Sequence, residues 1–225
     1  MATVAQDVPP LAAGDNLTRD EFMRRWEAHP EIKRSELIGG VVYTSFPVSV
    51  EHADREGDVG GWLFVYKTAT PGCATGHGST TFFGDDVVQA DVNLRILREY
   101  GGKSWVEGSY LHGAPELFTE ISRSSSAYDL HQKLEVYREA GVQEYVAFLL
   151  YERQVRWHIL VNGEYELLQP DVAGVYRSRV FPGVWLDGPA FWAGDTQAVI
   201  TRLHEGIATP EHQEFVARLA SQKRA

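Results

Sequence analysis

The stretch that decides the fold is "LFTEISRSSSAYDLHQKLEVYREAGVQEYVAFLL", residues 117–150. It opens with an apolar run and passes through a serine-rich turn into a helical pattern that ends near Gly141. It closes with a second apolar run that starts at 144 and continues to Tyr151, just beyond the stretch. Apolar runs of this length are typical of strands buried on both faces, and glycine often follows the last turn of a helix. The order strand, helix, strand predicts an α/β (α+β) fold with a mixed central sheet flanked by helices.

Two charged residues in this stretch interrupt the burial pattern. Glu120 lies within the first apolar run, and Lys133 falls beside Tyr137 on the apolar side of the helix when residues are spaced at about 100°. Lys133 could simply extend its ammonium group into water. A carboxylate inside an apolar strand, by contrast, needs a cation, several hydrogen-bond donors or a metal ion. Glu120 is therefore the stronger indication of a site.

A third polar residue can join these two. Residues 86–97 alternate between apolar and polar side chains, which predicts a strand with Asp91 on its polar side. Asp91 and Glu120 then lie on consecutive strands, with Lys133 on the next helix. Two carboxylates and a nearby backbone carbonyl, that of Ile121, form the oxygen-rich site that Mg²⁺ or Mn²⁺ prefers. With a lysine beside them, this composition fits phosphodiester hydrolysis.

The rest of the chain predicts three parts. Residues 1–16 are rich in Pro, Ala, Gly and Asp and are expected to form a disordered arm. Residues 17–187 are expected to form the main domain, which includes a short capped helix near Thr18, a hairpin at Gly39-Gly40 and a meander of strands after 144. Residues 188–225 are expected to form a C-terminal helical extension, whose apolar stripe could pack on the core or on a second copy of the chain.

Composition limits the functions that remain. The formal charge of −10 over 225 residues argues against binding DNA by bulk electrostatic attraction, so nucleic-acid binding would need a local basic patch, a metal ion or low affinity. The single cysteine, Cys73, excludes an internal disulfide, and the eight histidines lack the spacing of a zinc site. No apolar run reaches about 18 residues, and the N-terminus has no secretory signal, which predicts a soluble cytoplasmic protein without a membrane partner.

Several motifs resemble one family, the Uma-type putative restriction endonucleases of the PD-(D/E)XK nuclease superfamily. The most specific motif is "DLHQKLEVYREAGVQEYVAFLL" at 129–150, which is similar to the family pattern D-x-x-x-K-x-x-x-Y-x-x-x-G-V-x-E-Y-W. The resemblance covers residues 17–187 and implies that they form a restriction-endonuclease-like nuclease domain. The other motifs that carry it are "SELIGGVVY" at 35–43, "VEH" at 50–52, "ADV" at 90–92 and "LFTEISRSSS" at 117–126.

The resemblance implies a restriction-endonuclease-like fold and a set of site residues. Asp91 and Glu120 would bind the metal, Glu36 would contribute to the metal shell, and Lys133 would be the catalytic lysine. The superfamily usually carries this lysine two residues after the glutamate, where this chain has Ser122. The Uma-type pattern instead places it on the following helix, at Lys133.

Three further residues are candidates for substrate binding. Arg123 and Ser124 lie at the turn before the helix, where backbone amides and basic side chains could bind a phosphate. His52 lies in the "VEH" motif, and a role in packing or at the surface would explain it equally well.

The leading hypothesis is an endonuclease that hydrolyses DNA with Mg²⁺ or Mn²⁺. A non-catalytic nucleic-acid or protein interaction module that retains the fold is the alternative, and a hydrolase of small phosphoesters is a third reading. A homodimer is plausible because double-strand cleavage often uses two sites.

Overall fold

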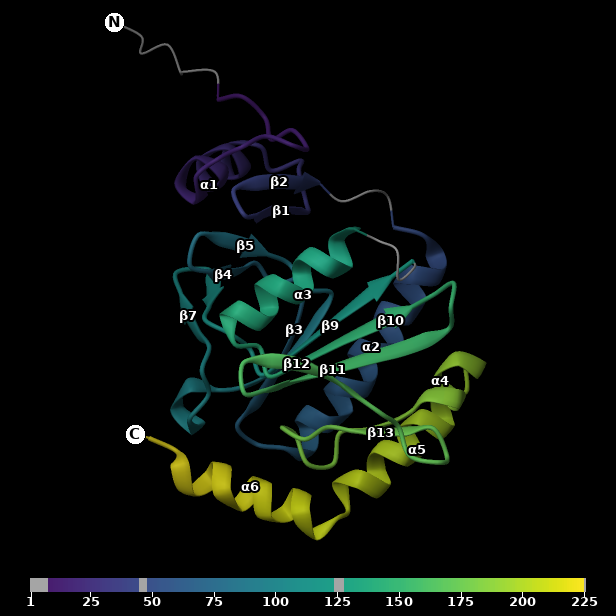
Figure 1. The fold of residues 1–225 in the computed structure, drawn as a ribbon. Helices are drawn as coiled ribbons and strands as arrows, with labels where there is room; N and C mark the ends of the chain where they lie inside the picture. Colours follow the sequence, from purple (N-terminus) through teal and green to yellow (C-terminus); the bar gives the residue numbers. More distant parts are fainter. Residues whose placement is uncertain (1–7, 45–47, 124–127, 225) are drawn as a thin grey trace, which may run out of the picture.

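The predicted strand, helix and strand lie at the centre of the molecule (Figure 1). The structure is a computed structural model that describes residues 8–44, 48–123 and 128–224. β9 (Leu117–Ser122) and β10 (Glu144–Leu149) are parallel neighbours, and α3 (Tyr128–Ala140) lies between them in the chain. Both strands are almost wholly buried, as their apolar composition predicts.

These two strands belong to a six-stranded mixed sheet, sheet B, with the order β12-β11-β10-β9-β6-β3. Helices cover both of its faces: in Figure 1, α3 crosses in front of the sheet and α2 (Val50–Ala69) runs behind it. Side chains alternate along β9, so that Leu117 and Ile121 pack with α2 and Phe118 packs with Tyr137 of α3. Glu120, two residues from Phe118, therefore faces α3. The other strands are β3 (Cys73–His77), β6 (Val92–Ile96), β11 (Gln154–Val161) and β12 (Glu164–Leu168).

A second six-stranded sheet, sheet A, has the order β2-β1-β5-β4-β8-β7. The predicted hairpin is confirmed, with positive φ angles at Gly39 and Gly40, a conformation that glycine adopts without a steric penalty. The sequence predicted one central sheet, whereas the described residues form two large sheets. The strands of sheet A are β1 (Ser35–Ile38), β2 (Val41–Thr44), β4 (Thr81–Phe83), β5 (Asp86–Val88), β7 (Trp105–Glu107) and β8 (Tyr110–His112).

The expected single strand over residues 86–97 is wrong. It is divided into β5 of sheet A and β6 of sheet B, and Gln89, Ala90 and Asp91 lie between the two strands. An unbroken alternation of polar and apolar residues gives no sign of such a change of sheet. Asp91 consequently does not face water but lies buried at the junction of the two sheets, with 3% of its surface exposed.

The N-terminal segment also differs from the expectation of disorder over 1–16. Residues 1–7 lie outside the described part, but residues 8–16 pack against the β1–β2 hairpin. Leu11 is buried beside Phe22 of α1 (Arg19–Ala28), and Asn16 forms a β-bridge with Val41. A short run of apolar side chains and backbone hydrogen bonds is enough to order a segment of low-complexity appearance.

The two predicted C-terminal helices are confirmed as α5 (Thr196–Ile207) and α6 (Pro210–Gln222). Leu203, Phe215 and Leu219 belong to the same apolar cluster as the α2 face of sheet B, so both helices complete the core of the domain. None of the described helices combines the length and apolar character needed to cross a bilayer. The remaining elements are η1 (Arg98–Tyr100), β13 (Val175–Arg177), β14 (Trp185–Asp187) and α4 (Gly188–Ala193).

Candidate active site

A buried ion-pair cluster joins the two sheets. Lys133 Nζ lies 2.9 Å from Glu120 Oε1 and 3.0 Å from Glu36 Oε2, so one ammonium group bridges two carboxylates. Glu120 Oε1 also accepts a hydrogen bond of 2.8 Å from the Tyr137 hydroxyl. Lys133 and Glu120 are each 8% exposed, which excludes the reading in which the lysine extends into water.

Local structure explains why these side chains meet. Lys133 and Tyr137 are four residues apart on α3 and therefore share one face of the helix, opposite the side of β9 that carries Glu120. Glu36 is held from the other direction, because its Oε1 accepts a 2.7 Å hydrogen bond from the backbone amide of Gln89. That amide belongs to the segment between the two sheets, so the break in the predicted strand also orients Glu36.

Asp91 is held by a second set of contacts in the same region. Its Oδ1 accepts a hydrogen bond of 2.8 Å from Arg34 Nη2, and its Oδ2 accepts one of 2.7 Å from the amide of Ile121. His52 Nε2 lies 3.6 Å from Oδ2 and 3.8 Å from Glu56 Oε2, distances that allow charge attraction but no hydrogen bond.

Burial and charge act in opposite directions on the ionisable groups. Burial raises the pKa of Glu120 to about 7, although the neighbouring Lys133 lowers it. Burial alone would lower the pKa of Lys133, but the attraction of Glu120 and Glu36 outweighs it and holds that pKa well above its ordinary value. Burial also opposes ionisation of Asp91, yet His52, the Ile121 amide and Arg34 together lower its pKa. Lys133 is thus charged at neutral pH and Asp91 is ionised.

These residues line a cavity of about 640 Å³. Glu36, Asp91 and Glu120 all contribute to its wall, together with Lys133 and Arg34. A larger cavity of about 890 Å³ lies over β11 and β12, but no carboxylate is among the described residues that line it. The converging charged groups identify the smaller cavity as the candidate active site.

The donor set of this cavity fits a hard divalent cation. Three carboxylates from separate strands and loops face one space, and His52 Nε2 is a buried nitrogen that makes no hydrogen bond with any described residue. The N–H and C=O groups of one strand residue point to the same side, so the Ile121 carbonyl faces the side from which its amide binds Asp91.

The site residues predicted from the sequence did not include Arg34, Glu56 or Tyr137. Arg34 and Tyr137 contact the carboxylates directly, and the ligand atoms of His52, Glu56 and Asp91 lie within 4.8 Å of one another, as in a possible metal-binding group. Glu56 lies four residues after His52, and Tyr137 lies four residues after Lys133. This helical spacing is the signal that could have revealed Glu56 and Tyr137.

The predicted substrate-binding residues are placed in part. Arg123 lines the cavity and its guanidinium group donates a 2.6 Å hydrogen bond to the hydroxyl of Tyr151. His52 also lines the cavity. Ser124 lies outside the described residues.

Comparison with known families agrees with this geometry. Residues 19–188 match Uma2, a family described as "Putative restriction endonuclease". The chain belongs to the Uma2 family. The matched part begins with α1 and ends at the first residue of α4, so that it contains every residue of the cavity named above, while α5 and α6 lie beyond it. The resemblance seen in the sequence is confirmed.

A solved structure has a similar fold. The crystal structure of a putative nuclease belonging to DUF820 from Anabaena variabilis ATCC 29413 superposes with a TM-score of 0.58 at 17% sequence identity, and the alignment covers 83% of this chain and 99% of that one. At this identity the likeness establishes the fold alone. No curated protein matches the chain.

Proposed function

We propose that the protein is a metal-dependent endonuclease that hydrolyses phosphodiester bonds in DNA. The observation that carries this proposal is the buried Lys133 between Glu120 and Glu36, in one cavity with Asp91. Buried charges are costly and rarely serve stability alone, so their concentration in a cavity favours a chemical role. Membership of a family of restriction-endonuclease type supports the same conclusion.

Asp91, Glu120 and the Ile121 carbonyl would hold the metal ion, Mg²⁺ or Mn²⁺, with Glu36 in support. When bound, the ion would supply Lewis acidity and neutralise charge on the phosphoryl group. The charges of the cavity suit this assignment. Its three carboxylates can bind a divalent ion, while Arg34, Arg123 and Lys133 supply positive charge for a phosphodiester.

Lys133 would act as a charged donor. Because its pKa is raised, the ammonium group keeps its proton at neutral pH and cannot take one from water. It can instead orient the attacking water and stabilise negative charge that develops on a phosphoryl oxygen. The Tyr137 hydroxyl, whose own pKa is raised by burial, remains a donor to Glu120 and fixes its orientation.

Arg34 and Arg123 are suited to the substrate. Both line the cavity, and a guanidinium group pairs well with a phosphate. These two cations supply the local positive charge that a chain of net charge −10 needs in order to approach DNA. We also propose a cytoplasmic homodimer, in which two copies would each cut one strand.

The direct test is cleavage of supercoiled plasmid by purified protein with Mg²⁺ or Mn²⁺, compared with EDTA. Nicked or linear product that depends on the metal and disappears in Lys133→Ala supports the proposal. Metal binding by calorimetry without any cleavage of DNA, RNA or small phosphoesters would instead favour a non-catalytic interaction module. Sedimentation at micromolar concentration tests the dimer.

A further inference from the structure

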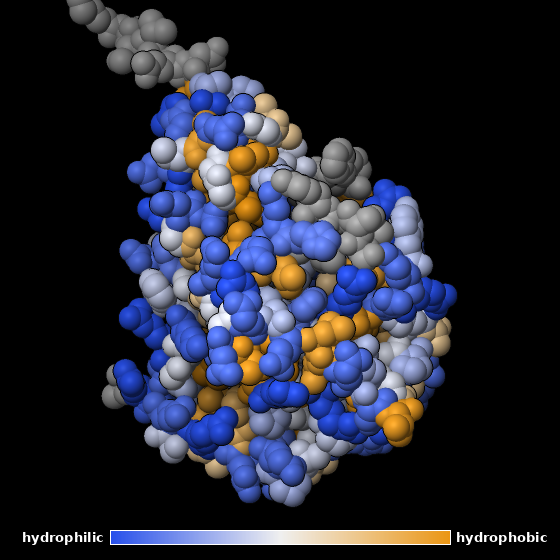
Figure 2. All heavy atoms as spheres, viewed as in Figure 1, coloured by the Kyte–Doolittle hydropathy of each residue, from blue (hydrophilic) through white to orange (hydrophobic). Residues whose placement is uncertain are grey.

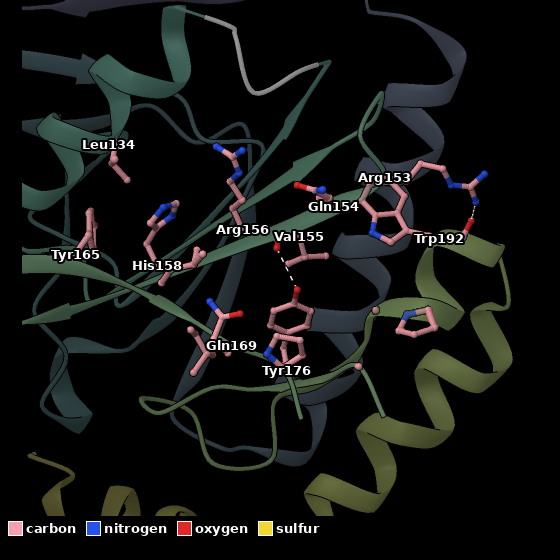
Figure 3. Close-up of a pocket in the computed structure, with 16 residues that line it drawn as sticks. Leu134, Arg153, Gln154, Val155, Arg156, His158, Tyr165, Gln169, Tyr176 and Trp192 are labelled. Carbon is pink, nitrogen blue, oxygen red and sulfur yellow. Dashed lines mark hydrogen bonds between the residues drawn. The ribbon is translucent and has the colours of Figure 1, made fainter. Parts of the chain in front are cut away.

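A groove of about 890 Å³ crosses the outer end of sheet B, away from the proposed catalytic cavity (Figure 3). β12 ends at Leu168, opposite Trp157, so the start of β11 has no neighbouring strand on the β12 side and forms the floor of the groove. In Figure 3, Arg156 and His158 project from β11 toward the side of Leu134, while Tyr176 and Gln169 lie on the other side. Figure 2, viewed as in Figure 1, shows apolar residues among hydrophilic ones over the region of β11, β12 and β13.

The lining of the groove combines positive charge with aromatic rings. Its ionisable side chains include Arg153, Arg156 and His158, and no carboxylate lines it among the described residues, although the chain as a whole carries a charge of −10. Tyr176 and Trp192 are half-buried rings at its edge. Positive charge beside aromatic surface is the combination that binds an unpaired nucleotide, with the phosphate on arginine and the base on a ring.

Two polar groups in the groove have no hydrogen-bond partner among the described residues. No oxygen of a described residue accepts a hydrogen bond from the Arg156 guanidinium group, whereas that of Arg153 donates to the backbone carbonyl of Trp192. The Nδ1 atom of His158 is buried and unpaired within the described part of the chain. Burial and, more weakly, the nearby Arg156 lower the pKa of His158, so its imidazole is neutral at neutral pH and Arg156 carries the positive charge of this pair.

The strand register connects this groove to the proposed catalytic cavity. Glu120 of β9 lies opposite Ala147 of β10, and Ala147 lies opposite Arg156 of β11. Residues opposite one another on neighbouring strands point to the same face, about 4.8 Å apart, so Arg156 follows Glu120 on the α3 face at roughly 10 Å. Ala147, between them in this row, is fully buried in the apolar cluster that includes Tyr137 of α3, so a strand that reaches both sites runs over the molecular surface. At about 3.4 Å per nucleotide of a stacked strand, roughly 10 Å corresponds to about three nucleotides, which is the shortest span between the two sites.

We propose that this groove binds an unpaired segment of the DNA strand next to the cleaved phosphodiester. Arg156 binds a backbone phosphate, and the aromatic rings at the groove stack on a base. The inference rests on the proposed function, which it deepens by naming a substrate with a single-stranded segment beside the cut. A base within a duplex is already stacked and paired, so blunt duplex DNA gains nothing from the rings.

The test measures binding in EDTA, where no metal-dependent cleavage can occur. Full-length protein is titrated into a fluorescein-labelled 12-nucleotide single strand, and the anisotropy is followed at several salt concentrations. Arg156→Ala should weaken binding about tenfold and reduce the salt slope by about 0.7, the value for one lost phosphate contact. Leu167→Glu, at a half-exposed position of the groove, should weaken binding similarly, because it adds a carboxylate where none is present.

The control is Arg218→Ala on α6, which removes the same charge at an exposed position that neither cavity includes. It should stay within twofold of wild type. The inference would be overturned if Arg156→Ala and Arg218→Ala lost equal affinity for the single strand, or if Arg156→Ala weakened binding of blunt duplex DNA equally. Preferential binding of AMP over the oligonucleotide would also overturn it. If binding of the single strand depends on Arg156 but the protein cleaves no DNA in Mg²⁺, the proposed function is wrong and the groove proposal stands. If the protein cleaves DNA in Mg²⁺ and Arg156→Ala cleaves it equally well, the groove proposal is wrong and the proposed function stands.

Discussion

Lys133 of α3 and Glu36 of β1 form an ion pair of 3.0 Å that connects the helix on sheet B to the edge region of sheet A. The same ammonium group binds Glu120 of β9, so a single side chain ties both sheets to the proposed catalytic centre. The cluster therefore affects stability as well as chemistry, and substitutions can separate the two contributions.

Glu120→Gln should reduce Mg²⁺-dependent cleavage by at least about a hundredfold, because a neutral amide is a poor ligand for a hard cation. The protein should remain folded, since the amide oxygen can still accept hydrogen bonds from Lys133 and Tyr137. Plasmid cleavage and thermal melting measure the two effects. The matched control is Glu135→Gln on the exposed face of α3, and a variant at position 120 that cuts like wild type would contradict the assignment.

Lys133→Met should destabilise the protein by about 3 kcal/mol at pH 8, because it leaves buried carboxylates without their cation. Burial already raises the pKa of Glu120 to about 7, and loss of the lysine raises it further. A carboxyl group with a raised folded-state pKa stabilises the fold at low pH and loses that contribution as pH rises. The loss should consequently be smaller at pH 5 than at pH 8 in urea titrations. Equal losses at both pH values would speak against this electrostatic origin, and adding Glu120→Gln should recover part of the stability.

Arg34→Ala should increase the affinity for Mn²⁺, by roughly three- to tenfold, because the guanidinium group now occupies Asp91 Oδ1 and repels an arriving cation. Isothermal titration calorimetry measures the change. Arg24→Ala on α1, where the arginine pairs with Glu21, is the control with the same loss of charge. An unchanged or lower affinity would place the metal away from Asp91.

His212 should make stability depend on pH at a distance from the proposed active site. Burial lowers the pKa of this imidazole, which lies on Tyr66 and contacts Thr70 Oγ1 at 2.9 Å. The unfolded chain takes up the proton first, so the contribution of His212 is present above its unfolded pKa of about 6.5 and is lost as pH falls. His212→Gln should lose less unfolding free energy between pH 7.5 and 5.5 than wild type does. An identical pH profile would contradict this assignment.

Phe215→Ala should destabilise the protein by about 3–5 kcal/mol, since the ring is buried in the same apolar cluster as Phe181 and α2. Gln213→Ala, at an exposed position of α6, should change stability by less than about 0.5 kcal/mol. Chemical denaturation followed by circular dichroism checks both. A small loss for Phe215→Ala would show that α6 is an appendage independent of the core.

The sequence was most informative where a charged residue lies within an otherwise apolar pattern. Glu120 and Lys133 stood out because each contradicts the apolar pattern around it, and the structure pairs them at 2.9 Å. Arg34 carried no such signal, since a lysine and an arginine before a strand are usual on a surface. Its role became visible only through contact with Asp91, which lies far away in the chain.

Local sequence patterns did not show which sheet each strand joins. Alternation specifies which side of a strand is buried, but not which neighbour the strand pairs with, so residues 86–97 gave no indication of a change from sheet A to sheet B. The groove over β11 and β12 was unpredictable for the same reason. Arg156 reads as the polar side of a strand, and only the register with Ala147 and Glu120 places it beside the proposed site.

The short segment from Gln89 to Asp91 makes assembly of the proposed site depend on completion of the fold. Glu36 comes from sheet A, Glu120 comes from sheet B, and Asp91 lies where the chain passes between them. A newly made or damaged chain in which only one sheet has formed cannot assemble all three carboxylates. The proposed nuclease activity therefore requires both sheets to be complete, and a partly folded copy would not cut DNA.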